Sequence, residues 1–433
     1  MEASNPHHEM EIDQVQFQNL DMITYLPPNV IDIILMCLPL RDAVRTSILS
    51  CDWRYKWVKI PRLSFDQRSF PPGCNELKIV NAVDQVLLVH RGPIQEFKCQ
   101  NYLKNCPAID RWILLLSDNG MKRFTLDLLQ SELAGRYKLP SCLFRCKSLI
   151  HLQISYCIFK PPSKLVGLHC LKTLHLRDVT IDNSFEDLIS KFPFLEELTL
   201  WDFDGPTCLK IQGPKLLYLN IRCRLKYLYF ENVPLVAIAC VHMSLPYRYK
   251  KSKESNLIKV LGCLHGVKRL TLNGFLLQFL AAGDVAERLP TPYNCLKNMS
   301  LSINFENLDD LLVAFCLFRS SPNLHELEIY AYPAVNTTSI PHESFWEVQE
   351  GFDGLFANLR IVTITNIIGS KNELRFVELV LAIAPVLEKM NIKNLATEAH
   401  TQLRICRDLL GFRRASPYAR INFFGPRDGR TDR

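Results

Sequence analysis

The chain has 433 residues, of which 48% are apolar and 22% are charged, and its formal net charge is +7. These proportions are close to the averages for folded globular proteins, so they exclude a chain that is disordered throughout. The length allows either a few domains or one long repeat array.

The N-terminal sequence and the sixteen cysteines indicate the cellular compartment in which the protein is expected. The first residues, MEASNPHHEMEIDQVQFQNL, are polar and acidic and lack the apolar centre of a signal peptide. No run of apolar residues is long enough to span a membrane. We therefore expect a cytoplasmic or nuclear protein without membrane contact, most of whose cysteines are free thiols buried as small apolar side chains.

The first organised block predicts short helices. Ile31, Ile34, Leu35 and Leu38 have the spacing of one apolar stripe on a helix, and Pro39 ends it. A second short helix is expected from Asp42, and a third around two tryptophans. So small a helical unit has a marginal core, so we expect it to complete itself against a partner.

Most of the chain repeats the pattern L-x-x-L-x-L, in which Ile, Val, Phe, Met or Cys replace some leucines. Eleven repeats start at Ile94, Met121, Leu149, Leu171, Leu195, Leu216, Val267, Leu296, Leu324, Leu359 and Leu387. Most starts are 21 to 29 residues apart, which is the period of leucine-rich repeats. The wide gap after Leu216 predicts a degenerate repeat near Leu235–Ile238, and the gap after Leu324 predicts an insertion. In each unit the last two apolar residues point inward from a short strand, and the chain returns as a helix or an irregular arc.

These two features together resemble a known family. Leu26-Pro27, Ile34-Leu35, Leu38-Pro39 and Trp53-Arg54 follow the F-box pattern. The stretches Ile109–Ile113, Gly369–Leu374 and Ala384–Met390 are similar to those of the plant subclass that joins an F-box, leucine-rich repeats and an FBD domain. The expected fold is α/β, with a three-helix F-box at 20–66, a repeat solenoid at 75–355 and an FBD closing unit at 356–424. The segments 1–19 and 425–433 are expected to be disordered.

The resemblance implies a substrate-recognition subunit of an SCF-type (Skp, cullin, F-box) ubiquitin ligase. The F-box would dock on a Skp-type adaptor and, through it, on a cullin. The implied adaptor-binding residues are Leu26, Pro27, Ile31, Ile34, Leu35, Leu38 and Pro39, some of which must instead form the core of the helical unit. Cys51-Asp52 stand where the family has basic residues before the tryptophan, which implies weaker attraction to an acidic adaptor.

Target binding is expected on the polar face of the repeat sheet. The residues between the two inward positions of each strand, and those just after them, would face the target protein. They are Gln153, His175, Arg177, Thr199, Asn220, Arg222, Thr271, Asn273, Ser300, Glu328, Tyr330, Thr363 and Thr365. Any solvated sheet face would show the same polar column. Trp201 follows a strand and is the candidate binding anchor, although it could also cap the next repeat.

The sequence lacks the marks of catalysis. It has no C-x-x-C pair and no glycine-rich phosphate loop, and the spacing of Cys142, Cys146, His169 and His175 matches no zinc finger. We therefore expect no enzyme activity, no cofactor and no metal. From Arg404 to the end, eight arginines oppose three aspartates. We read this as a solvated basic end rather than a nucleic-acid site.

Two alternatives stay open. The first is a repeat scaffold that binds proteins outside a ligase, with a vestigial F-box. The second is a receptor whose repeats hold a small molecule at the target interface. The target, the pathway and the oligomeric state are not encoded in any pattern that we recognise.

Overall fold

The computed structural model describes residues 26–103, 106–128, 135–162, 164–181, 189–225, 227–244, 256–332, 341, 345–346 and 354–425. The segments predicted to be disordered lie outside these residues, except for Gly425. The chain forms two compact units, Met1–Ile94 and Gln95–Arg433, which are described separately.

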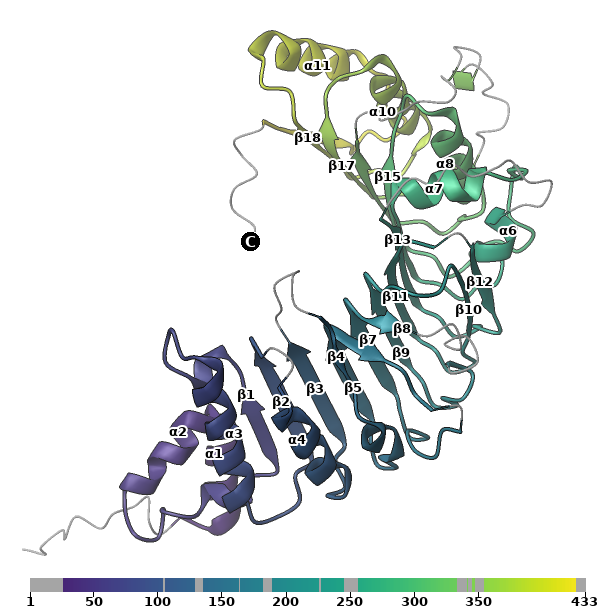
Figure 1. The fold of residues 1–433 in the computed structure, drawn as a ribbon. Coiled ribbons are helices and arrows are strands. Elements are labelled where there is room, and N and C mark those ends of the chain that lie inside the picture. Colours follow the sequence, from purple (N-terminus) through teal and green to yellow (C-terminus); the bar gives the residue numbers. More distant parts are fainter. Residues whose placement is uncertain are drawn as a thin grey trace, which may run out of the picture. The chain divides into compact units, whose positions relative to one another are not determined.

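The first unit contains short helices and one strand. Its elements are α1 (Pro28–Cys37), α2 (Leu40–Arg45), the 3-10 turns η1 (Thr46–Ile48) and η2 (Trp57–Lys59), β1 (Arg62–Phe65), η3 (Gln67–Ser69) and α3 (Glu76–Val89) (Figure 1). Pro27 and Pro39 stand at the N-caps of α1 and α2, where a missing N–H costs nothing.

One apolar cluster holds this unit together. Ile31 and Leu35 from α1 pack with Ala43, Trp53, Trp57, Val58 and Ile60, and the half-buried Val86 of α3 packs against them. His90 Nε2 lies 2.9 Å from the carbonyl oxygen of Ile60, and Arg91 N–H donates to the carbonyl of Val58. The helix α3 therefore belongs to this unit, whereas the sequence placed the start of the repeats at residue 75.

The region expected to form a third helix has a different form. Thr46–Ile48 and Trp57–Lys59 are single 3-10 turns, joined by further turns around Trp53. The second helix also begins at Leu40, two residues before Asp42, and ends at Arg45. Trp53 and Trp57 are both buried, so their spacing reflects core packing within a turn-rich segment rather than a regular helix.

The second unit is built on one parallel sheet. In sheet order its strands are β2 (Glu96–Asn101), β3 (Arg123–Leu128), β5 (His151–Ser155), β7 (Thr173–Arg177), β9 (Glu197–Trp201), β11 (Tyr218–Cys223), β13 (Ile238–Met243), β14 (Arg269–Leu272), β15 (Asn298–Ile303), β16 (Glu326–Ala331), β17 (Ile361–Ile367), β18 (Lys389–Asn394) and β19 (Arg420–Phe424). Each pairs with the next in parallel. This confirms the α/β class and the repeat-type sheet.

The repeat pattern explains the register. Leu152, Leu174, Leu198 and Leu219 stand opposite one another on successive strands, and all four are fully buried. The next apolar position forms a second buried row in the same way. Because side chains alternate along a strand, the residue between the two rows points to the other face. The core therefore lies on one face of the sheet, and the predicted polar column lies on the other.

The segments that return between strands differ along the unit. In the first half they carry α4 (Ala108–Ser117), the 3-10 turn η4 (Ser141–Arg145) and two small parallel sheets. These sheets are β4 (Tyr137–Lys138), β6 (Cys157–Phe159) and β8 (Thr180–Ile181), and β10 (Cys208–Gln212) with β12 (Tyr227–Glu231). In the second half the segments carry α6 (Asn256–Leu261), α7 (Gly274–Ala281), α8 (Leu308–Arg319), α10 (Lys371–Ile383) and α11 (Ala399–Gly411), on the core side of the sheet.

The strand β13 fills the gap that the repeat pattern left after Leu216. Its inward residues are Ala239 and Val241, and Val236 is also buried. Ala239 is smaller than the leucine found at this position in neighbouring repeats, which is why the pattern is weak there. A degenerate repeat therefore does lie close to the predicted position.

A capping turn explains the stretch Gly369–Leu374 ahead of α10. Ser370 Oγ accepts the N–H of Glu373, and Glu373 Oε2 accepts the N–H groups of Ile368, Gly369 and Ser370. Gly369 has a φ of +80°, and a side chain there would lie 2.7 Å from Ile405 on α11. Glycine, serine and glutamate are thus each required by the backbone of this turn.

Candidate functional site

The predicted adaptor-binding residues divide by burial into two groups. Ile31 and Leu35 are buried in the core of the first unit. Pro27, Ile34, Leu38 and Pro39 are exposed, and Leu26 is half-buried. The spacing alone could not separate these groups, because both lie on the same apolar stripe. The exposed members are the ones that a partner could reach.

Three further exposed apolar residues were missed by the motif. Ile33 lies on α1, and Ile48 and Leu49 lie in the turn after α2, where Ile48 is 83% exposed. The sequence did contain a signal for Ile33: because Ile33 and Ile34 are consecutive, α1 has apolar residues on more than one side. Apolar side chains that stay in water in so small a unit favour a protein partner.

The polar column of the second unit is aligned strand by strand. Gln153, His175, Thr199 and Asn220 stand in register on β5, β7, β9 and β11. The row continues through Cys240, Thr271, Ser300, Glu328 and Thr363. All of these residues are at least partly exposed, so they line one surface, which we call the open face. Arg177, Arg222 and Tyr330 are exposed two residues further along their strands.

A pocket of about 420 Å³ lies on the open face. It spans β5 to β11 and is lined by Gln153, Ile154, Ser155, His175, Leu176, Arg177, Glu197, Thr199, Trp201, Tyr218 and Asn220. Six of these residues belong to the predicted target-binding column or to its anchor. The pocket carries one arginine, one glutamate and several neutral donors and acceptors, which suits a polar peptide.

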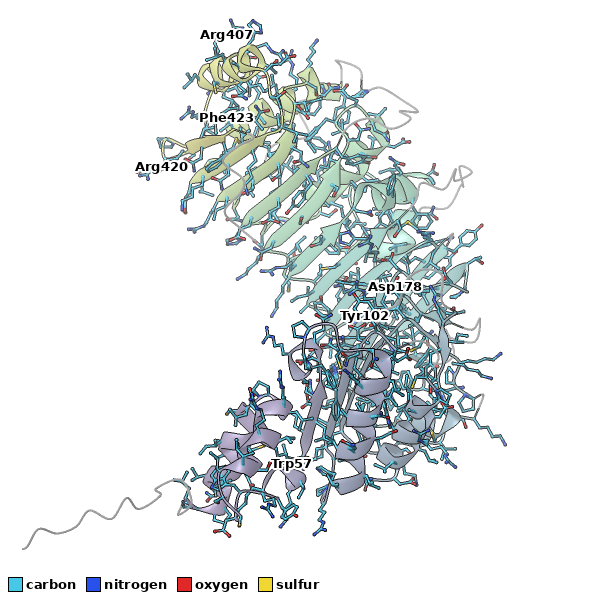
Figure 2. The ribbon with its side chains drawn as sticks, turned by 60° about the vertical axis from the view of Figure 1, so that its left-hand side comes forward. Trp57, Tyr102, Asp178, Arg407, Arg420 and Phe423 are labelled. Atoms are coloured by element: carbon cyan, nitrogen blue, oxygen red, sulfur yellow. The ribbon has the colours of Figure 1, made fainter. Side chains whose placement is uncertain are left out.

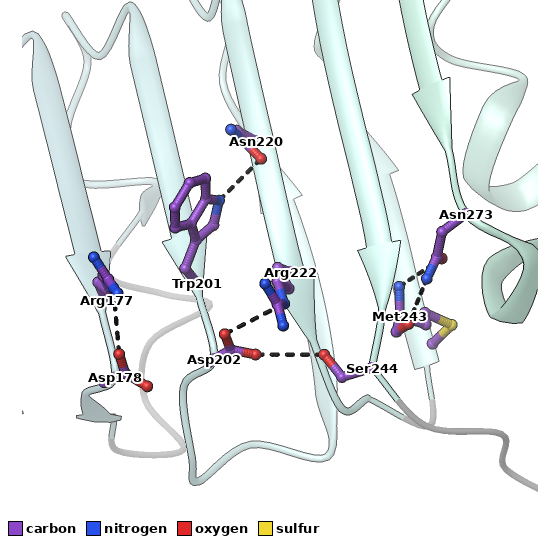
Figure 3. Close-up of polar contacts among 9 residues, drawn as sticks. All are labelled: Arg177, Asp178, Trp201, Asp202, Asn220, Arg222, Met243, Ser244 and Asn273. Atoms are coloured by element: carbon purple, nitrogen blue, oxygen red, sulfur yellow. Dashed lines mark hydrogen bonds and ion pairs between the residues drawn. The ribbon is translucent and has the colours of Figure 1, made fainter. Parts of the chain in front are cut away.

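Trp201 is braced within this pocket. Its indole Nε1 donates to Asn220 Oδ1 at 3.0 Å (Figure 3). Asn220 Nδ2 in turn donates to the hydroxyl of Tyr218 at 2.9 Å. The indole is half-buried. The tryptophan thus contacts the next repeat, as one reading of the sequence held, and also lines the pocket.

Two arginines of the open face form ion pairs with aspartates. Arg177 Nε lies 3.4 Å from Asp178 Oδ2, and Arg222 Nε lies 3.3 Å from Asp202 Oδ2 (Figure 3). Both aspartates have a positive φ, near +50°, directly after a strand. Aspartate tolerates this left-handed conformation better than most residues. The two aspartates therefore turn the chain and hold the arginines.

The histidines of the open face are uncharged at neutral pH. Burial, with Arg123 nearby, lowers the pKa of His151 to about 4, and burial also lowers the pKa of His175. The two rings meet edge to face, with centroids 5.5 Å apart. The pocket therefore presents the neutral ring of His175 to a ligand.

Asn273 has a structural position that the sequence did not indicate. Its side chain accepts the N–H of Met243 at 2.8 Å and donates to the carbonyl of Met243 at 2.6 Å. It also caps α7 by accepting the N–H of Leu276. The residue was predicted to face the target, but it joins β13 to α7 instead.

The described residues include the cysteines and the other possible metal ligands. All sixteen cysteines are free, and burial raises the thiol pKa of Cys99 to about 12 and that of Cys146 to about 11. No group of three His, Cys, Asp or Glu side chains in the described ranges could hold a metal ion. Within those ranges no helix has both the length and the apolar content to cross a membrane.

Comparison with known proteins decides the family. The family model described as FBD-associated F-box protein At5g56370, LRR repeats, matches residues 109–329, and the FBD model matches residues 354–392. The F-box/FBD/LRR-repeat protein At1g13570 of Arabidopsis thaliana is 35% identical over 93% of this chain and 98% of its own length. This chain belongs to the F-box/FBD/LRR-repeat family. Another family member, At5g56420 of Arabidopsis thaliana, is 28% identical over 76% of the chain and 86% of its own length.

Both models of the F-box/FBD/LRR-repeat family match parts of the second unit. The repeat model covers β5 to β11, which line the open-face pocket. The FBD model covers β17, α10 and most of β18, including the capping turn at Gly369. The predicted resemblance is therefore confirmed for the family and for its repeat and FBD parts.

Proposed function

We propose that this F-box protein is the substrate-recognition subunit of an SCF-type ubiquitin ligase. The observation that carries the proposal is the exposed apolar surface of the first unit. Ile33 and Ile34 on α1, and Leu38 directly after it, are exposed above a core formed by Ile31 and Leu35. Burying their exposed apolar area against a partner is favourable by roughly 25 cal/mol per Å².

The partner on this surface is proposed to be a Skp-type adaptor, which would connect the chain to a cullin. Pro27, Ile34, Leu38 and Pro39 keep the adaptor-binding role that the motif implied, and Ile33 and Ile48 join them. Ile31, Leu35 and Leu26 support the surface from within or at its edge. The limits of 20–66 for the F-box and 75–355 for the repeats stay predictions.

The target protein is proposed to bind the open face around the pocket of β5 to β11. Trp201 offers a half-buried aromatic ring, held in place by Asn220, and such rings are frequent binding anchors. Arg177 and Arg222 add charged groups at the rim of the face. The chain would hold a target without transforming it, in the cytoplasm or the nucleus.

Capture of the adaptor tests the proposal. The full chain would be co-expressed with a Skp-type adaptor and purified by a tag on the adaptor. We expect co-elution of the wild-type chain and loss of co-elution with an Ile34→Asp, Leu38→Asp double variant. Leu88→Asp is the matched control, because Leu88 is 85% exposed on α3 of the same unit.

A scaffold without ligase function is the second candidate. It is favoured by Cys51 and Asp52, which are both exposed where the family carries positive charge. Failure of the wild-type chain to co-elute with the adaptor would support the scaffold and contradict the receptor.

A further inference from the structure

The helix α11 is packed on one side only. Of its residues Ala399–Gly411, Ile405 and Leu409 are buried. Leu403 is 71% exposed and Leu410 is 78% exposed. Residues seven apart on a helix lie nearly above one another, so these two leucines form one apolar strip in water.

A basic groove borders this strip. It runs between α10 and α11, has a volume of about 700 Å³, and is lined by Lys371, Leu374, Arg375, Glu378, Arg404, Arg407, Asp408, Gly411 and Phe412. Four of these side chains are cationic and two are anionic. Leu374 and Phe412 supply apolar contact inside the groove. The helix thus carries an apolar strip and a positively charged flank side by side.

Two ion pairs lie within the groove. Arg375 pairs with Glu378 at 3.3 Å, and Arg407 pairs with Asp408 at 3.7 Å. Arg407 is 79% exposed, and such surface pairs contribute little free energy, so a partner could displace them readily. Figure 2 shows Arg407 on the outer side of the last helix.

The side chain of Arg404 is held in place by a hydrogen bond to the backbone. Its Nη2 donates to the carbonyl oxygen of Gly369 at 2.9 Å. A carbonyl fixes the guanidinium but does not neutralise its charge. Arg413 and Arg414, directly after the helix, are also exposed. The basic C-terminal end of the sequence is therefore a positioned surface over Arg404–Arg414, rather than a loose run of charge.

We propose that α11 and the groove beside it form a second docking surface, which binds an acidic amphipathic helix of a partner protein. The leucine strip would receive the apolar side of that helix, and the arginines would pair with its carboxylates. The charge complementarity of the groove selects the acidic partner. This surface lies on α10 and α11, whereas the open-face pocket lies on β5 to β11.

Two other ligands fit the same chemistry less well. A nucleic acid would use the cations but would leave the two leucines in water. An anionic membrane surface needs a broad apolar face, whereas α11 offers two leucines and places a groove with two carboxylates beside them. Both serve as comparison ligands in the test.

The test uses the full chain and defined probes. The first probe is a fluorescent helical peptide of about eighteen residues, or five turns, with leucine on one side and glutamate elsewhere. A peptide of the same composition in scrambled order, phosphatidylserine vesicles and duplex DNA are the other probes. The proteins compared are the wild type, Arg407→Glu, and a Leu403→Ser, Leu410→Ser double variant.

The proposal predicts saturable binding of the ordered peptide that weakens with salt. Each variant should reduce its affinity at least about tenfold, which corresponds to about 1.4 kcal/mol. Arg145→Glu is the control for charge, since Arg145 is exposed in η4, and it should leave binding unchanged. Equal binding of the scrambled peptide, or stronger binding of vesicles or DNA, would overturn the proposal. Adaptor capture should be the same for all variants, so this test stands apart from the proposed function.

Discussion

The hydroxyl of Tyr332 donates a hydrogen bond to Asp310 Oδ2 at 2.8 Å, behind the strands of the repeat sheet. Asp310 also accepts the N–H of Asn304 and is fully buried at the start of α8. Burial raises the pKa of this carboxyl from 3.8 to about 7.

Asp310 therefore makes stability depend on pH. Between pH 4 and pH 7 the folded chain holds a proton that the unfolded chain has released, so the free energy of unfolding falls as pH rises through this range. The variant Asp310→Asn has no titrating carboxyl at this position and so lacks this pH dependence. We expect the stability of the wild type relative to the variant to fall by on the order of 2–4 kcal/mol from pH 4 to pH 8. Urea unfolding at several pH values measures it, and a difference independent of pH would contradict the assignment.

The capping turn before α10 should contribute measurably to stability. Ser370→Ala removes the acceptor for the N–H of Glu373 and the hydrogen bond that Ser370 Oγ donates to Glu306. We expect a loss of about 1–2 kcal/mol in thermal or chemical unfolding. Ser117→Ala, which removes an exposed bond to the carbonyl of Leu114, is the control and should cost about 0.5 kcal/mol or less. An equal effect of the two changes would mean that the cap is unimportant.

Asn273 should behave as a structural residue and not as a target contact. Asn273→Ala leaves both backbone groups of Met243 without their side-chain partner and removes the cap of α7. We expect a loss of about 2–3 kcal/mol in stability. Thr271→Ala, two residues earlier on the open face, should change stability far less. If the stability of Asn273→Ala is unchanged, the hydrogen bonds of Asn273 to Met243 and Leu276 are not important to the fold.

The exposed Asp52 should slow binding of the adaptor. Asp52→Arg restores the positive charge that is typical of the family at this position, so we expect faster association with an acidic adaptor. Stopped-flow or surface plasmon resonance experiments at low and high salt measure this association rate. The gain should be several-fold at low salt and should shrink as salt screens the charges. No change in the association rate would indicate that this position lies away from the interface.

The repeat sheet was predictable because its pattern recurs in register. Leu152, Leu174 and Leu198 obey the same spacing, and each repeat buries its leucines against the next. The weak repeat at Ala239 was found only by the length of the gap. The two small parallel sheets were not predicted, because strands such as Thr180–Ile181 are too short to show a pattern.

The candidate sites were predictable as sets of residues but not as surfaces. One helical stripe contains both Ile31, which is core, and Ile34, which is exposed, and only packing separates them. Asn273 and Thr271 look alike in the sequence, yet one braces a helix and the other faces outward. Asp310 was not singled out in the sequence, because its hydrogen bond to Tyr332 joins residues 22 apart in the chain.

The most direct test of the receptor is a comparison of ubiquitylated proteins in cells with the proteasome inhibited. The wild-type chain would be compared with the adaptor-surface variant Ile34→Asp, Leu38→Asp and with an open-face variant Trp201→Ala, Arg177→Ala. We expect a set of proteins whose ubiquitylation falls with both variants, because presentation of a target requires both surfaces. If no protein depends on both surfaces while both variants remain folded, the chain is not a ligase receptor that uses its open face.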